Sequence, residues 1–108
     1  MNWVNYIFYF LGGIFLFNSI PHIVSGMMGR AFQSPFAKPA GEGLSSSIIN
    51  VIWGFFNIMT AYFLIFQVGT FNLHSIFDVF VTGLGAFLVA IFNARHFGKF
   101  NGGNSTKN

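Results

Sequence analysis

Three long apolar runs are separated by shorter segments rich in glycine, proline and polar residues. Each run is about as long as the roughly 20 apolar residues with which an α-helix crosses the hydrocarbon core of a bilayer. The first two runs contain no charged side chain, and Asp78 is the only acid in the third. The pattern therefore predicts an all-α membrane protein with three transmembrane helices, over about residues 3–25, 48–68 and 75–95.

The connections between these helices differ in length. Residues 26–46 form the only long loop, whereas residues 69–74 form a short turn. Pro21 removes a backbone hydrogen bond near the end of the first helix, so we expect a kink or an end there, with Gly26 and Gly29 as later exits. One of the serines at 45–47 is expected to cap the second helix by accepting its free backbone N–H groups.

Composition supports a membrane setting. The chain of 108 residues is 54% hydrophobic but only 6% charged, whereas about 25% of the residues of a typical soluble domain are charged. A soluble helical bundle is therefore the weaker alternative. So short a chain forms one domain, residues 1–95, and leaves no room for a separate catalytic unit. Cysteine is absent, which excludes disulfides, thiolate metal sites and a cysteine nucleophile.

Lysine and arginine alternate along the connecting segments. None precedes the first helix, two lie in the loop, none lies in the turn, and three follow from residue 95 onward. Because cytoplasmic segments are enriched in these residues, we expect the N-terminus outside and the loop and C-terminus, with a flexible tail over 96–108, in the cytoplasm. The cations do not form the clustered basic face that nucleic-acid binding requires, so we expect no nucleic-acid partner. Instead, four of them are predicted to contact lipid headgroups: Arg30, Lys38, Arg95 and Lys99.

Polar side chains inside the predicted spans gather on the cytoplasmic side. His22 lies one turn beyond Asn18 in the first helix, and the spacing of Asn50, Trp53 and Asn57 places them on one face of the second. We expect these five residues to meet in one polar pocket. Mutual hydrogen bonding that joins the two helices is the favoured interpretation. A ligand pocket or proton relay with His22 as its titratable member is the alternative.

The third helix carries small residues at four-residue intervals, a spacing typical of closely packed transmembrane helices. The stripe consists of Thr82, Ala86, Ala90 and Ala94. We predict a helix-packing face, either within the monomer or in a homo-oligomer. Asp78, at the outer end of the same helix, matches with Ser75 the S-x-x-D pattern of a helix start, so we expect a capping role.

Two further features admit both a structural and a functional interpretation. His96 and His22 come from different helices on the same side, which would suit bis-histidine haem, but no local motif supports it. We therefore expect neither cofactor nor metal, and interpret His96 as an interfacial anchor. Lys38, Phe36 and their neighbours in the loop suit recognition of lipid headgroups or a partner protein. A proline-stiffened connector held at the interface is the favoured interpretation.

The stretch PHIVSGMMGRAFQSPFAKP, followed by GLSSS and NVIWGFFN, resembles a family of small bacterial integral membrane proteins without an attributed activity. The resemblance covers residues 21–57 and implies the bacterial inner membrane, but it transfers no functional residue.

Three classes of function remain open. The first is a non-enzymatic protein that acts by helix association, as a homo-oligomer or as an accessory subunit of a larger membrane complex. The second is an oligomeric transporter or channel with a polar pocket around His22. The third, a redox or lipid-modifying subunit, lacks paired carboxylates or a nucleophilic triad.

Overall fold

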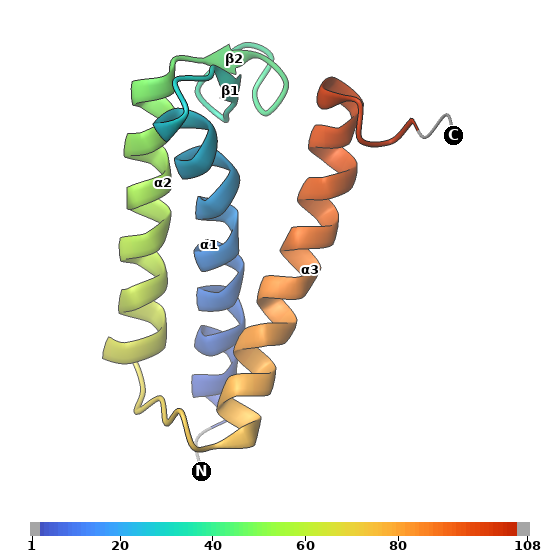
Figure 1. Cartoon of the computed structure of the whole chain (residues 1–108). Helices are drawn as coiled ribbons and strands as arrows, with labels where there is room; N and C mark the ends of the chain where they lie inside the picture. The colour runs from blue at the N-terminus through green and yellow to red at the C-terminus, as the bar shows by residue number, and fades with distance from the viewer. Residues whose placement is uncertain (1–2, 106–108) are drawn as a thin grey trace.

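The computed structural model describes residues 3–105 and consists of three long helices and a small two-stranded ladder (Figure 1). α1 spans Val4–Met27 and α3 spans Ile76–Asn101. Between them, α2 spans Ser47–Tyr62 and continues as the π-helical segment η1, Phe63–Gln67. All three helices are long and apolar enough to cross a membrane, which confirms the predicted number of candidate spans.

The helices give the molecule two distinct ends. The start of α1 and the 68–75 connection lie together at one end, which we call the turn end (Figure 1). The 28–46 loop and the last turns of α3 lie at the other, which we call the loop end. The long axis of the molecule measures 45 Å. This length matches the roughly 40–45 Å thickness of a bilayer with its headgroups.

One helix boundary, the end of α3, differs from the sequence expectation. α1 continues through Pro21 to Met27, between the later exits expected at Gly26 and Gly29 and close to the predicted end at residue 25. α3 continues to Asn101, six residues beyond the predicted end at residue 95, and stops where Gly102 adopts a left-handed φ of 84°. The first six residues of the predicted tail, 96–101, are therefore helical, and its last residues, 106–108, lie outside the described part.

Serine side chains begin the second and third helices, as expected. The Ser46 hydroxyl accepts a hydrogen bond from the backbone N–H of Ile49 at 3.2 Å, and that of Ser75 accepts one from the N–H of Asp78 at 3.3 Å. Each bond satisfies one of the backbone donors that lack a partner within the helix. These caps fix where the chain enters α2 and α3.

α1 is the central helix of the structure. It packs along both α2 and α3, whereas α2 and α3 barely contact each other (Figure 1). The adjacent residues Gly12 and Gly13 face different partners: a Cβ on Gly12 would collide with Ile65 on the second span, and one on Gly13 with the backbone of Thr82 on α3. The missing side chains let both neighbouring helices approach the α1 backbone closely.

The interior is polar and the surface is apolar. Among the described residues, the fully buried side chains with the largest volume are His22, Asn50 and Asn57, while most of the phenylalanines lie on the outside. Such a distribution is costly in water, because buried polar groups lose hydration and exposed aromatic rings remain wet. It suits a chain surrounded by hydrocarbon, where polar groups must be satisfied between helices.

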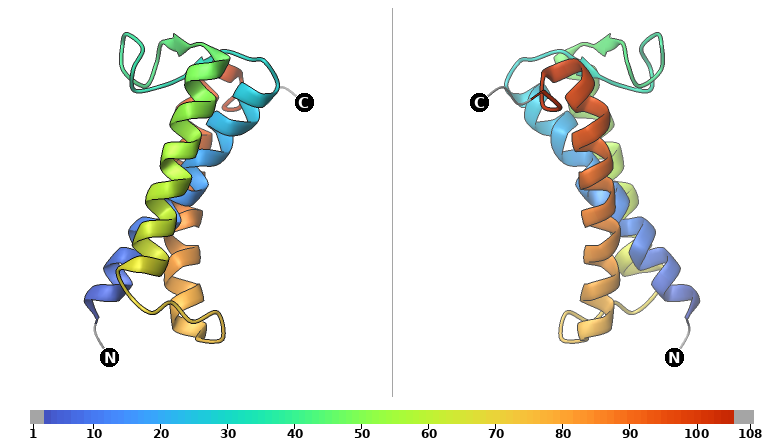
Figure 2. Two further views of the ribbon diagram at one scale, coloured as in Figure 1. Left: turned by 90° about the vertical axis from the view of Figure 1, so that its left-hand side faces the viewer. Right: turned by 90° about the vertical axis from the view of Figure 1, so that its right-hand side faces the viewer.

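The loop between α1 and α2 is held together by a short antiparallel ladder. β1, Phe32–Gln33, pairs with β2, Leu44–Ser45. The segment between these strands projects from one face of the helix layer, whereas the C-terminal end of α1 leans toward the opposite face (Figure 2). The loop end therefore has two different faces, and a different cavity opens on each.

Candidate functional site

A chain of asparagine side chains crosses the helix layer. The amide of Asn93 on α3 donates to the side-chain oxygen of Asn18 on α1 at 3.0 Å, and Asn18 in turn donates to that of Asn57 on α2 at 3.1 Å. Asn57 completes the chain by donating to the backbone oxygen of Trp53 at 2.8 Å. Each helix contributes one asparagine, so the chain of hydrogen bonds joins all three helices.

His22 and Asn50 form a second hydrogen-bonded group nearer the loop end. The Nδ1 atom of His22 lies 2.7 Å from the side-chain oxygen of Asn50. The Asn50 amide nitrogen donates to the backbone oxygens of Phe32, Ser45 and Ser46, at 3.2, 3.1 and 3.0 Å. Because the Asn50 nitrogen donates to backbone oxygens, the Asn50 side-chain oxygen is the atom that faces the imidazole. An amide oxygen can only accept a hydrogen bond. Nδ1 of His22 is therefore the donor, and Nε2 carries the ring's lone pair.

The lone pair on His22 faces a cavity. Nε2 forms no hydrogen bond within residues 3–105, yet no buried side-chain nitrogen or oxygen there lacks a partner. Hence Nε2 retains some accessible surface, although only 2% of the surface of His22 as a whole is accessible. His22 lines a cavity of about 290 Å³, which we call the His22 cavity. Its other lining residues are Asn18, Ser34, Pro35, Gly41, Trp53, Phe92, Asn93, His96 and Phe97.

Aromatic rings wall this cavity. The rings of Trp53 and Phe97 lie edge to face with the His22 imidazole, at centroid distances of 6.4 and 6.0 Å. The imidazole of His96 stacks on Phe92 at 5.9 Å. Apolar walls with few, fixed polar groups are typical of small-molecule sites. The volume falls near the lower end of the range for such sites, so a small ligand or the head of an amphiphile fits the space.

Loop residues line the His22 cavity at the loop end. His96 on α3 donates from Nε2 to the backbone oxygen of Gly41 at 2.7 Å. The amide of Asn101 on α3 donates to the side-chain oxygen of Gln33 at 3.1 Å. Together with the Asn50 bonds, these contacts tie the loop to all three helices. Gln33 and Ser34 are buried, so this part of the loop belongs to the interior.

The sequence-predicted pocket residues do lie together, in two groups. Asn18 contacts Asn57, and His22 contacts Asn50, while Trp53 borders the cavity between them. Whether they bind a ligand stays a prediction. Sequence reasoning missed Asn93, although it is the one amide in the apolar part of α3. It also interpreted His96 as an interfacial anchor, whereas its ring lines the cavity.

A haem between His22 and His96 is not favoured by this geometry. Each ring already uses one nitrogen in a hydrogen bond, with Asn50 and with the Gly41 carbonyl. The cavity of about 290 Å³ is also small for a tetrapyrrole, since drug-sized ligands already occupy roughly 300–1,000 Å³. Within residues 3–105, no group of three or more potential metal ligands is present.

The small-residue stripe of α3 is used within the monomer over its first half. Thr82 and Ala86 lie against Gly13 of α1, and the Gly85 backbone approaches Phe10. Farther along, α3 diverges from α1. Ala90 and Ala94 line an open cleft between the two helices instead of packing against one. A homo-oligomer through the whole stripe would therefore require α3 to leave α1.

The polar residues at the turn end form a separate group. Asp78, at the start of α3, is only 8% exposed. Its carboxylate accepts a hydrogen bond from the backbone N–H of Asn72 at 3.0 Å and so fixes the 68–75 connection to α3. Tyr9 and Asp78 line a cavity of about 260 Å³ there. His74 is exposed and does not line this cavity.

The four cations predicted to contact headgroups are all exposed. Arg30 and Lys38 lie in the loop, and Arg95 and Lys99 lie in the last two turns of α3, so all four are at the loop end. This band of positive charge lies where one face of a membrane would meet water.

No family model, no curated protein and no solved structure matches this chain. The fold and the site thus define a class only: an all-α chain with three candidate membrane spans and a polar interior.

Proposed function

We propose that this chain is a non-enzymatic, multi-pass protein of the bacterial inner membrane that binds a small ligand in the His22 cavity. The loop end faces the cytoplasm and the N-terminus lies outside in this proposal. The placement of Arg30, Lys38, Arg95 and Lys99 supports this orientation, because all four lie at the loop end and cytoplasmic segments are enriched in lysine and arginine.

The observation that carries the proposal is the lone pair of His22. The side-chain amides of Asn18, Asn50 and Asn57 are all satisfied by helices or loop, whereas Nε2 of His22 faces the cavity without a partner among residues 3–105. If His22 served only to join α1 to α2, the hydrogen bond from its Nδ1 atom to Asn50 would be sufficient, and Nε2 would have no role. A ligand that donates a hydrogen bond to Nε2 would complete the polar network in a water-poor site, where such a bond is strong.

The walls of the cavity indicate the chemical class of the ligand. Nε2 of His22 accepts a hydrogen bond, and the rings of Trp53, Phe92 and Phe97 offer apolar edges and faces. No Asp, Glu, Lys or Arg side chain lines the space, so a charged molecule would enter unpaired at high cost. A neutral molecule with a hydroxyl donor on an aromatic or aliphatic body fits best, for example a phenol or the alcohol head of a membrane-soluble amphiphile.

Mass spectrometry of retained molecules tests this function. Protein extracted gently from native membranes should carry a neutral small molecule that denaturation releases. The variant His22→Ala should retain much less of it, by roughly tenfold if one hydrogen bond to the ligand is lost in a dry site. His74→Ala is the matched control, since His74 is exposed at the other end of the molecule. Equal retention by both variants would refute the cavity as the site.

Helix association is the second candidate function. α2 and α3 have almost no mutual contact, and each keeps one long side free of other helices (Figure 1). A partner helix, from a second copy or from a larger complex, can lie there. Crosslinking in native membranes tests this idea, because a discrete adduct would support association through these free sides. A monomer at all crosslinker concentrations would exclude it.

Transport through a single copy is less well supported. Toward the turn end, Gly13 lies against the backbone of Thr82 and Gly85 against that of Phe10, so α1 and α3 leave no open path between them. The His22 cavity therefore opens only in the loop half of the molecule. A channel would need several copies around a shared axis.

A further inference from the structure

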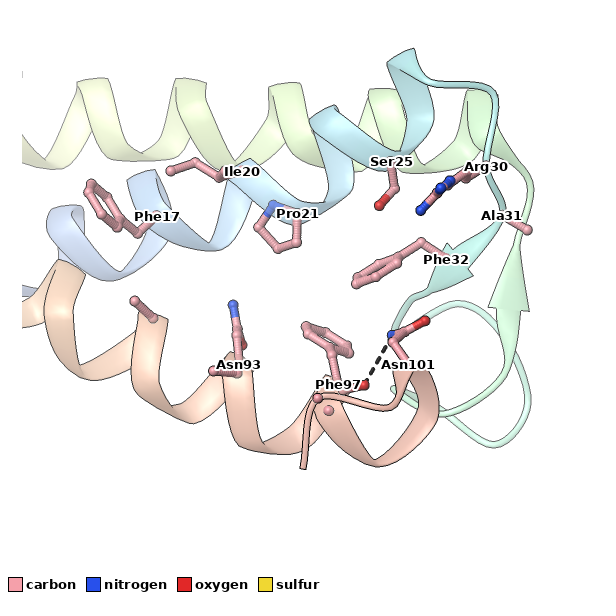
Figure 3. A pocket seen from close by; sticks show the side chains of 14 residues that line it. Phe17, Ile20, Pro21, Ser25, Arg30, Ala31, Phe32, Asn93, Phe97 and Asn101 are labelled. Atoms are coloured by element: carbon pink, nitrogen blue, oxygen red, sulfur yellow. Dashed lines mark hydrogen bonds between the residues drawn. The ribbon is translucent and has the colours of Figure 1, made fainter. Parts of the chain in front are cut away.

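A second, larger cavity opens on the opposite face of the loop end. It is a cleft of about 540 Å³ between the C-terminal halves of α1 and α3 (Figure 3). Phe17, Ile20 and Pro21 line it from α1, and Ala90 and Ala94 line it from α3. We call it the α1–α3 cleft. Asn93 and Phe97 border both this cleft and the His22 cavity, so these two side chains of α3 lie between the two spaces.

The cleft tapers toward the middle of the membrane. At its deep end, α1 and α3 come together where Gly13 meets Thr82, and they diverge toward the loop end (Figure 1). A partner helix about 10 Å across needs a groove of constant width. A narrowing cleft instead suits a thin, flexible chain that enters from the wide end.

The length of the cleft matches one leaflet. From Phe17 to the end of α1 at Met27, ten residues at 1.5 Å each give about 15 Å. One leaflet contributes about half of the roughly 30 Å hydrocarbon core, which is also about 15 Å. An acyl chain that lies in the cleft would therefore extend from the headgroup level to the bilayer centre.

Arg30 is the one cationic side chain among residues 3–105 that lines the cleft, and it lies at the wide end. Gly29 adopts a left-handed φ of 76°, which turns the chain just after α1 and places Arg30 at the rim. The Arg30 backbone is fixed by a 2.9 Å hydrogen bond from its N–H to the Ser25 oxygen. The guanidinium forms no hydrogen bond or ion pair within residues 3–105. Figure 3 shows it beside Ser25, which also lines the cleft.

Charge complementarity indicates the sign of the headgroup. The chain has only two acidic residues, Glu42 and Asp78, and neither lines the cleft. Arg30 is thus an uncompensated charge that can bind a phosphate through two parallel hydrogen bonds. Lys99, exposed in the last turn of α3, adds positive potential at the same level.

We infer that the α1–α3 cleft binds one anionic phospholipid of the adjacent leaflet, with its phosphate at Arg30 and one acyl chain along α1 toward Phe17. The headgroup lies at the loop end, and the chain fills the space between Pro21 and Ala94. This site is independent of the proposed function of the His22 cavity, which lies on the other side of Asn93 and Phe97.

Native mass spectrometry of the whole chain in detergent tests the inference. The probes are phosphatidylglycerol and phosphatidylcholine with identical acyl chains, and sodium phosphate as a competitor. One phosphatidylglycerol per chain should bind in preference to phosphatidylcholine. Arg30→Gln should weaken phosphatidylglycerol binding about tenfold. Lys38→Gln removes the same charge from the loop but not from the cleft, so it should change this binding about twofold or less.

Two further variants test the apolar part of the site. Ala94→Phe fills the cleft and should weaken binding of both lipids, whereas Leu88→Phe, on an exposed part of α3 outside the cleft, should not. Circular dichroism would establish that each variant keeps its helices. Equal binding of the two lipids, equal effects of the two charge substitutions, or displacement by millimolar phosphate would each overturn the inference.

Discussion

The side chain of Asn50 joins three parts of the chain that are distant in sequence. Its oxygen accepts from His22 on α1, while its nitrogen donates to backbone oxygens on both sides of the β1–β2 ladder. The residue is 0% exposed. Water cannot reach so buried a side chain to replace these bonds, so the loop, α1 and α2 depend on the same amide.

Replacement of Asn50 by alanine should destabilise the fold by about 2 kcal/mol. The substitution leaves the His22 donor and several carbonyls without partners, and hydrogen bonds between transmembrane segments contribute roughly 0.6 kcal/mol each on average, up to about 1.7. The free energy of unfolding in mixed detergent micelles measures the loss. Asn104→Ala, which removes one exposed hydrogen bond to the Arg95 carbonyl, is the control and should change it little. Equal effects would show that Asn50 is not a central contact.

Much of this polar cluster is readable from the sequence. Asn18 and His22 lie one turn apart, and Asn50 and Asn57 lie two turns apart, so helical spacing alone predicts which side chains share a face. Spacing does not say how helices are rotated about their axes. The contact between Asn93 and Asn18 depends on the rotation of α3, which the close approach at Gly13 and Gly85 sets. For that reason helical spacing alone does not predict that Asn93 contacts Asn18.

At the level of helices, glycine determines how closely α1 and α3 approach. Gly85 is buried against the Phe10 backbone, whereas Gly83, two residues earlier on the same helix, has open space around it. The two glycines differ in surroundings but belong to the same transmembrane stretch. They therefore form a natural pair for comparison.

Gly85→Leu should separate α1 from α3, because a backbone atom cannot move aside for the new side chain. We expect a loss of about 2 kcal/mol or more in the free energy of unfolding, in the range typical of overpacked interiors. Gly83→Leu should be neutral, since its side chain enters lipid. Unfolding in mixed micelles distinguishes the two, and similar stability of both variants would show that the α1–α3 contact is wrongly placed.

Helix ends were less predictable than helix positions. The expected end of the third helix rested on the first cation, Arg95, yet a cation does not interrupt backbone hydrogen bonding. α3 continues until the left-handed Gly102 and thereby brings His96, Phe97 and Asn101 against the loop. Pro21 does not end α1, which continues to Met27, near the predicted end at residue 25.

At the level of the whole molecule, the distribution of charge predicts the orientation in the membrane. The chain lacks cysteine, so single cysteines can be introduced without background. A cysteine at Lys38 or Lys99 should react with a membrane-impermeant maleimide only in inverted vesicles. A cysteine at His74 should react only in intact spheroplasts. The opposite pattern, or reaction of all three from one side, would contradict the proposed topology.

The two tryptophans allow a direct test of the His22 cavity. Trp53 lines the cavity, whereas Trp3 is exposed at the turn end. In a Trp3→Phe variant, Trp53 is therefore the only tryptophan, and its fluorescence reports on the cavity. The variant in lipid nanodiscs can be titrated with p-cresol, a small neutral molecule with an aromatic body and a hydroxyl donor.

The account predicts a saturable change in Trp53 emission. His22→Ala in the same background should weaken the apparent affinity about tenfold, as expected for the loss of one hydrogen bond in a dry site. His74→Ala should leave the affinity unchanged. A change that rises linearly with p-cresol and is the same in all three proteins would reflect partition into lipid, and it would contradict ligand binding at His22.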